Sequence, residues 1–284
     1  RSGREASMDV RLIATDMDGT LLGSDHRISP RNSAAFAAAR DAGLAVLAIS
    51  GRQAYSIGGL VAGSPLEGFA IGSNGSVAVD LAARTILFEE LLDLDAQQAV
   101  TRAMLEHFPD AHVRSVRDAG NTHVAQHGYT GDEEPACDLA PWPVTVRYAD
   151  LDDVLAEPSV KLVIKHPDPT VAPETMLEVA RDLAVPGTHP TTSGAPFLEI
   201  GRAGVSKATA LARFAASRGV DATQVVAFGD NLNDVEMLQW AGLGVAMGNA
   251  VPGAMEAADE VTLHHDEDGV AVVIERLLGL RSAR

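Results

Sequence analysis

Short apolar runs that end in polar turns recur in the first and last parts of the chain. Residues 10–15 (VRLIAT), 44–49 (LAVLAI) and 225–228 (VVAF) are such runs. They are too short for typical helices, so they predict buried strands. Two further strands are expected at 69–72 and 244–247.

Helical segments alternate with these strands. Ser29-Pro30 predicts a helix start, with serine as the N-cap and proline in the first turn, and Gly43 predicts its end. Further helices are expected at 53–61, 205–218 and 270–280, and from Pro252 onward. Regular alternation of strand and helix predicts a parallel sheet with helices as crossovers.

The middle of the chain, 83–193, follows a different pattern. Strands near 111–116, 122–126 and 160–165, and helices at 95–107 and after Pro173, alternate less regularly there. We therefore predict an α/β domain, 83–193, inserted into a core formed by 8–82 and 194–284. Residues 1–7 are polar and precede Met8, and we interpret them as an expression scar.

Composition and charge narrow the possible partners of this 284-residue chain. It has 22 Lys+Arg against 39 Asp+Glu, a net charge of −17, and 4% aromatic residues. This balance argues against nucleic-acid and anionic-membrane surfaces, which need clustered basic residues. The single cysteine, Cys137, excludes an internal disulfide. No targeting segment is recognisable, and glycines interrupt the apolar stretch 54–79, so a cytoplasmic location is expected.

Three of the predicted strands end in residues that carry chemistry. These residues are Asp16-Met17-Asp18, Ser50-Gly51-Arg52 and Gly229-Asp230. Ligands of an open parallel sheet bind beyond the carboxyl ends of its strands, so neighbouring strands would bring these side chains into one crevice. Three close carboxylates repel each other unless protons or a cation offset their charge. Oxygen ligands of this kind favour Mg²⁺.

Other phosphate, metal and nucleophile motifs do not match the sequence. An EF-hand loop beginning at Asp16 would have Leu21 where glycine is required and Arg27 where a glutamate ligand is required. No GxxxxGK[ST] loop occurs, and Gly204-Val205-Ser206-Lys207-Ala208 lacks the final glycine of a GxSxG nucleophile elbow.

Four segments in order resemble the motifs of the haloacid dehalogenase-like superfamily. They are Asp16-Met17-Asp18-Gly19-Thr20-Leu21-Leu22, Ser50-Gly51-Arg52, Lys207 within Gly204-Val205-Ser206-Lys207, and Gly229-Asp230-Asn231-Leu232-Asn233-Asp234. Asn74-Gly75 and 244–250 resemble further signatures of its Cof-type branch. The resemblance implies a doubly wound, Rossmann-like parallel sheet with an inserted α/β cap of the subclass IIB type.

The resemblance also implies roles for individual residues. Asp16 is expected to be the nucleophile and Asp18 the general acid and then the base. Mg²⁺ is expected to bind Asp16, the Asp18 backbone carbonyl and Asp230. The residues expected to hold the phosphate oxygens are Ser50, the Gly51 amide, Asn233 and Lys207.

Two more residues have roles that the resemblance leaves open. Arg52 is expected either to contact phosphate or to pair with an aspartate, and Asp234 to orient Lys207 or a metal-bound water. Only three lysines occur, Lys161, Lys165 and Lys207. A lysine inside a motif is therefore a stronger indication of function than usual.

The expected activity is Mg²⁺-dependent hydrolysis of small phosphate monoesters, especially sugar phosphates, through an aspartyl-phosphate. The alternatives are a phosphosugar mutase or a dedicated sugar-phosphate phosphatase of the same superfamily, and a non-catalytic regulator that binds phosphorylated ligands. Substrate choice would rest with cap residues such as Arg114, Arg117, His123 and His127. The sequence leaves the oligomeric state open.

Overall fold

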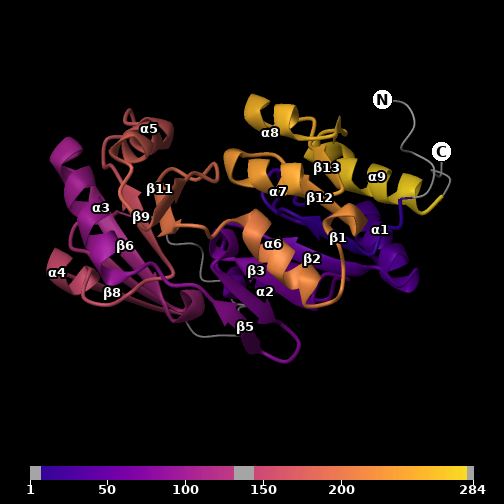
Figure 1. Ribbon diagram of the computed structural model, residues 1–284, viewed down its shortest axis with the longest axis horizontal. Coiled ribbons are helices and arrows are strands. Elements are labelled where there is room, and N and C mark those ends of the chain that lie inside the picture. Colours follow the sequence, from indigo (N-terminus) through magenta and orange to yellow (C-terminus); the bar gives the residue numbers. More distant parts are fainter. Residues whose placement is uncertain (1–7, 131–143, 280–284) are drawn as a thin grey trace.

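A computed structural model describes residues 8–130 and 144–279 of the chain. Residues 1–7, interpreted above as an expression scar, and Cys137 lie outside the described residues. The described chain forms two sheets with helices around them (Figure 1).

The larger sheet has eight strands in the order β14-β13-β12-β1-β2-β3-β4-β5. The strands from β14 to β3 run parallel, and β4 and β5 are added as an antiparallel hairpin at the edge. The strand bounds are Leu12–Thr15 (β1), Ala45–Ile49 (β2), Phe69–Gly72 (β3), Val77–Asp80 (β4), Thr85–Glu89 (β5), Val225–Gly229 (β12), Leu243–Ala246 (β13) and Glu260–Val261 (β14).

Helices cover both faces of this sheet, so the predicted doubly wound arrangement is confirmed. Phe36, Ile57 and Ile274, from α1, α2 and α9, pack on one face. Leu211 and Met237, from α6 and α7, pack on the other. The helix bounds are Pro30–Asp41 (α1), Ala54–Val61 (α2), Lys207–Ala216 (α6), Val235–Trp240 (α7), Pro252–Ala257 (α8) and Gly269–Leu277 (α9).

The cap contains a separate six-stranded sheet in the order β10-β11-β9-β6-β7-β8, on the left of Figure 1. Its bounds are His112–Arg117 (β6), Thr122–Gln126 (β7), Thr145–Ala149 (β8), Lys161–Lys165 (β9), Thr188–Thr191 (β10) and Leu198–Arg202 (β11), with helices Leu94–His107 (α3), Leu151–Val154 (α4) and Pro173–Leu183 (α5). Alternating side chains along these strands point to opposite faces. Val113 and Ile164 pack against the cap helices on one face of the cap sheet. Val116 and Val163, on the other face, belong to a hydrophobic cluster that also contains residues of the core domain.

The two sheets divide the chain slightly differently from the expected boundaries of 83–193. Strand β5 belongs to the core sheet, and strand β11 belongs to the cap sheet. The cap therefore spans residues from about 90 to about 202. Both strands pair antiparallel with a neighbour, so neither shows the strand–helix alternation from which the boundaries were inferred.

Within the described residues, no helix combines the length and apolar character needed to cross a membrane.

Candidate active site

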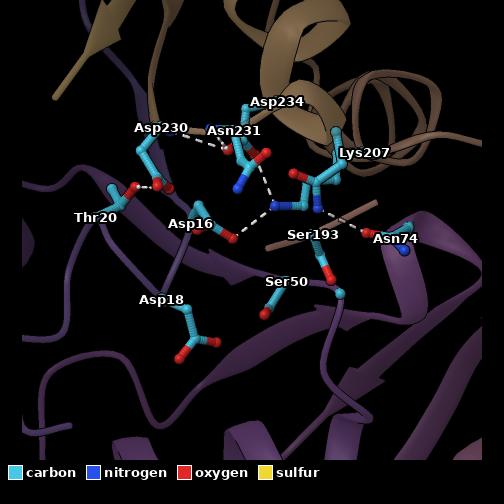
Figure 2. A network of polar contacts seen from close by, with 12 residues as sticks. Asp16, Asp18, Thr20, Ser50, Asn74, Ser193, Lys207, Asp230, Asn231 and Asp234 are labelled. Carbon is cyan, nitrogen blue, oxygen red and sulfur yellow. Dashed lines mark hydrogen bonds and ion pairs between the residues drawn. The ribbon is translucent and has the colours of Figure 1, made fainter. Parts of the chain in front are cut away.

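Four parallel strands of the core bring polar residues to one edge of the sheet. Asp16 follows β1, Ser50 follows β2, Asn74 lies in the turn after β3, and Asp230 follows β12. Strands β12, β1, β2 and β3 are direct neighbours, so the predicted convergence of Asp16, Ser50 and Asp230 occurs, and Asn74 joins them (Figure 2).

Lys207 is a buried cation at the centre of this group. Ser206 and Thr209 form a capping box that starts α6 at Lys207. The Lys207 Nζ atom lies 2.6 Å from Asp16 Oδ1 and 2.6 Å from Asp234 Oδ1. Burial alone would lower the pKa of Lys207, but the two carboxylates outweigh it and raise the pKa above its ordinary value.

Asp234 supports this arrangement with both of its carboxylate oxygens. Oδ1 accepts from Lys207, and Oδ2 accepts the backbone N–H groups of Asp230 and Asn231, each at 3.0 Å. Because both oxygens already have donors, Asp234 serves better to orient Lys207 and the turn after β12 than to bind a cation.

Asp16 and Asp230 are the other two carboxylates of the site, and a side-chain hydrogen bond joins them. Thr20 Oγ1 donates to Asp230 Oδ1 at 2.9 Å, and Gly19 packs so closely that a side chain there would overlap the Asp230 carboxylate. Burial, reinforced by Asp234, raises the pKa of Asp230 to about 6. Burial also raises the pKa of Asp16 well above its ordinary value; Lys207 opposes this rise, and Asp234 and Asp230 add to it.

This donor set fits a divalent cation. Oxygen atoms of Asp16, Asp230 and Asp234 lie within 4.8 Å of one another, and Lys207 contacts two of the three, Asp16 and Asp234. Three carboxylates against one ammonium leave a surplus of negative charge, which adds to burial in raising the pKa values of Asp16 and Asp230. Hard oxygen ligands in this number match Mg²⁺.

Asp18 is held away from these carboxylates by Arg52. Its side chain points to the other side of the β1 end in Figure 2. Arg52 Nε and Nη2 contact Asp18 Oδ2 and Oδ1 at 2.5 and 2.6 Å. Of the two expectations for Arg52, the structure shows the pairing with an aspartate.

The remaining expected phosphate-binding residues border the same crevice. Ser50 is buried, and its Oγ accepts the Arg52 backbone N–H at 3.1 Å. The carbonyl of Gly51 accepts from Lys161 Nζ at 2.8 Å. Asn233 Nδ2 donates to Asn74 Oδ1 at 2.9 Å.

Sequence patterns did not reveal three polar residues beside the site. Lys161 and Glu199 are buried on cap strands and form an ion pair with each other. Asn249 Nδ2 donates to the Gly19 carbonyl at 2.7 Å. Asn249 follows β13 within the segment that resembles a Cof-type signature, so the sequence could have indicated it. For Lys161, the only indication in the sequence was that the chain has just three lysines.

Two of the cap residues expected to face a substrate have other roles. Arg117 points into the cap, where it binds Glu157 Oε1 at 2.8 Å and the carbonyls of Asp153 and Val154. His123 is buried against the Gly120 carbonyl, and burial lowers its pKa to about 3. Arg114 is also buried, over the Tyr129 ring, and His127 is exposed.

A cavity of about 320 Å³ opens between cap and core beside the site. The cap contributes Arg181, His189 and Thr191 to its lining. The core contributes Asn74, Ser206, Lys207, Leu232, Asn233, Val235, Glu236 and Gly253. Neither Arg114 nor Arg117 lines it, so the structure places other cap residues next to Lys207.

Comparison with known proteins assigns the chain to a family. Residues 13–274 match the model of the haloacid dehalogenase-like hydrolases. The 5-amino-6-(5-phospho-D-ribitylamino)uracil phosphatase YcsE of Bacillus subtilis is 30% identical over 96% of this chain and 98% of its own length. The pyridoxal phosphate phosphatase YbhA of Escherichia coli is 28% identical over 94% of this chain and 98% of its own length.

Solved structures agree with this assignment. A haloacid dehalogenase-like hydrolase from Bacteroides thetaiotaomicron has 28% identity and a TM-score of 0.73, over 94% of this chain and 99% of that chain. The subclass IIB sugar phosphatase BT4131 shares the fold at 20% identity, with a TM-score of 0.78 over 94% of this chain and 98% of that chain. The chain is therefore an enzyme of the haloacid dehalogenase-like hydrolase family, and its relatives YcsE and YbhA are named phosphatases.

Proposed function

We propose that this enzyme hydrolyses small phosphate monoesters through an aspartyl-phosphate formed on Asp16. The observation that carries the proposal is the contact between Asp16 Oδ1 and the buried Lys207 Nζ at 2.6 Å, beside Asp230 at the ends of β1 and β12. The contact with Lys207 fixes the position of the Asp16 carboxylate. Because the site carries surplus negative charge, it favours phosphate binding that is assisted by a cation.

Mg²⁺ would be held by Asp16, Asp230 and the backbone carbonyl of Asp18. When bound, it would offset the charge of the phosphate and of the attacking carboxylate. Thr20 and Gly19 position Asp230 for this role, and Asn249 holds the Gly19 carbonyl.

The chain's own residues account for both chemical steps. In the first step, an Asp16 oxygen forms a bond to phosphorus while the ester oxygen leaves and takes a proton from Asp18. In the second, Asp18 removes a proton from water, and the water oxygen attacks phosphorus. The bond to Asp16 breaks, and inorganic phosphate and the free carboxylate are released.

The ion pair between Arg52 and Asp18 has to break before Asp18 can transfer a proton in either step. Both Asp18 oxygens are held by Arg52, so neither can reach the ester oxygen or the attacking water until Arg52 moves away. A bound phosphate dianion would compete for the same guanidinium, because arginine binds phosphate and carboxylate in the same two-point manner. Ser50, the Gly51 amide and Asn233 would hold the other phosphate oxygens.

The cavity supports a small-molecule substrate. Its volume of about 320 Å³ lies at the lower end of the range typical of metabolite sites. Hydrogen-bonding side chains such as His189, Thr191 and Glu236 suit a hydroxylated leaving group. YcsE and YbhA, named for phosphorylated metabolites, agree in substrate class.

Phosphate release from a panel of phosphorylated metabolites, with and without Mg²⁺, tests the proposal. We expect Mg²⁺-dependent release from sugar phosphates or similar esters, and none from Asp16→Asn. Full activity of Asp16→Asn would contradict the mechanism. An isomeric phosphate without free phosphate would indicate a mutase, and tight binding without turnover would indicate a regulator.

A further inference from the structure

Glu199 is a buried carboxylate that the chemistry above does not use. It lies on cap strand β11 at the contact with the core and is 1% exposed. Lys161 Nζ binds its Oε1 atom, and Ser193 Oγ donates to its Oε2 atom at 2.6 Å. The side chain of Asn74, from the core, also hydrogen-bonds to it. Donors from the cap and from the core thus meet at one carboxylate.

Lys161 connects Glu199 to the turn after β2. Lys161 belongs to cap strand β9, and its Nζ atom donates to the Gly51 carbonyl at 2.8 Å. That carbonyl belongs to the same peptide unit as the Arg52 N–H, which donates to Ser50 Oγ at 3.1 Å. The Lys161 ammonium binds the carbonyl of this peptide, and the N–H of the same peptide binds Ser50 Oγ. Lys161 therefore fixes the orientation of the turn and, through it, that of the Ser50 hydroxyl.

Asn74 connects Glu199 to Asn233. An ionised carboxylate only accepts hydrogen bonds, so Asn74 must turn its amide nitrogen to Glu199 and its oxygen to Asn233. Asn233 then donates one amide hydrogen to Asn74 Oδ1, at 2.9 Å. The second hydrogen on the same nitrogen is the donor available to a phosphate oxygen.

We propose that Glu199 and Lys161 are a positioning pair that holds the Gly51 turn and the Asn233 amide in the orientation that binds phosphate. Because both residues belong to the cap, the phosphate site is complete only when the cap lies against the core. This inference rests on the proposed function, in which Gly51 and Asn233 bind the phosphate.

The charge state of Glu199 agrees with this role. Burial would raise its pKa, but Lys161 and the donors Ser193 and Asn74 outweigh burial and lower the pKa below its ordinary value. The carboxylate is therefore ionised and can only accept. The orientation of Asn74, and through it that of Asn233, follows from this.

Binding of inorganic phosphate in the presence of Mg²⁺, measured by calorimetry, tests the pair without requiring turnover. We expect Glu199→Gln and Lys161→Met each to weaken phosphate binding about tenfold or more, because small displacements of oriented donors are costly. Mg²⁺ affinity should stay unchanged. Glu157→Gln, which removes the ion pair of Arg117 inside the cap, is the matched control and should bind phosphate normally.

The double variant Lys161→Met/Glu199→Gln separates positioning from a purely structural role. It leaves no buried charge unpaired, so its melting temperature should exceed that of either single variant. Its phosphate affinity should nevertheless stay low. Recovery of both stability and phosphate binding to wild-type values would overturn the proposal.

Two further measurements keep the test decisive. If Glu199→Gln does not fold, Asn74→Ala removes the amide that joins Glu199 to Asn233 and keeps the contact of Lys161 with Gly51, and it should weaken phosphate binding without changing Mg²⁺ affinity. Normal phosphate binding in Asn74→Ala and in the double variant would overturn the pair, even if phosphate release depends on Asp16. An active Asp16→Asn enzyme would instead contradict the proposed function.

Discussion

Arg52 holds both carboxylate oxygens of Asp18, with Nε–Oδ2 and Nη2–Oδ1 distances of 2.5 and 2.6 Å. Arg52 directly follows Ser50 and Gly51 in the turn after β2, where the phosphate is proposed to bind. We infer that substrate phosphate draws Arg52 away from Asp18, so that Asp18 becomes able to transfer protons only in the presence of substrate.

Asp18→Asn should therefore affect the two chemical steps differently. An aryl phosphate has a good leaving group that departs without a proton donor, whereas attack by water still needs the base. We expect a burst of phenol equal to the amount of enzyme, followed by turnover reduced by about 10²–10⁴-fold. Rapid-quench kinetics measures this burst. Steady turnover at the wild-type rate would exclude Asp18 as the base.

Lys207→Met should destabilise the protein as well as inactivate it. The substitution leaves Asp16 and Asp234 buried without their cation, which costs about 3–5 kcal/mol when one partner of a buried pair is lost. Urea unfolding of the metal-free protein measures the change. Lys165→Met, at a lysine that is only partly buried on cap strand β9, is the control and should lose less. Equal losses in the two variants would contradict the assigned role of Lys207.

The effect of Mg²⁺ on stability should depend on pH. The pKa of Asp230 is raised from 3.8 to about 6, so in the metal-free protein folding favours the protonated form. The contribution of Asp230 to the free energy of unfolding is fully present below the pKa that Asp230 has in the unfolded chain. It is lost as the pH rises through about 6, and the loss is on the order of 3 kcal/mol.

Mg²⁺ should offset this loss by neutralising the ionised carboxylates. We expect Mg²⁺ to raise the melting temperature strongly at about pH 7.5 and little at about pH 5, where protons compete with the metal. EDTA should reverse the effect and stop turnover. An equal Mg²⁺ effect at both pH values would contradict the assignment of Asp16 and Asp230 as ligands.

Gly19→Ala should weaken Mg²⁺ binding by displacing Asp230. Gly19 has a φ of +76°, and an added methyl group would overlap the Asp230 carboxylate. Gly43→Ala is the matched control, because Gly43 has a φ of +85° but no atom within 4 Å of the added methyl. Both variants should lose about 1–2 kcal/mol of stability from backbone strain. Calorimetric titration should show weaker Mg²⁺ binding only in Gly19→Ala.

The sequence was most informative where strand ends coincide with motifs. The apolar runs before Asp16, Ser50 and Asp230 predicted parallel strands, and parallel strands bring their carboxyl ends to one edge of a sheet. That rule predicted the convergence of these residues, because it depends only on chain direction and strand order.

The cap was predicted less well, because its contacts depend on how two sheets face each other. Arg117 and Arg114 lie on the same strand, yet Arg117 packs among the cap helices and Arg114 over Tyr129. The pairing of Lys161 with Glu199 joins strands 38 residues apart in the chain. Neither arrangement leaves a local pattern, since side-chain direction depends on strand register.

In the proposed mechanism, Asp16 carries the phosphoryl group during turnover. Mass spectrometry of enzyme quenched in acid during turnover of a good substrate tests it most directly. We expect one phosphoryl group on the peptide that contains Asp16, absent from Asp16→Asn and from enzyme treated with EDTA. Phosphate release by an enzyme that carries no phosphoryl group at any time point of the quench, or carries it elsewhere, would contradict phosphoryl transfer through Asp16.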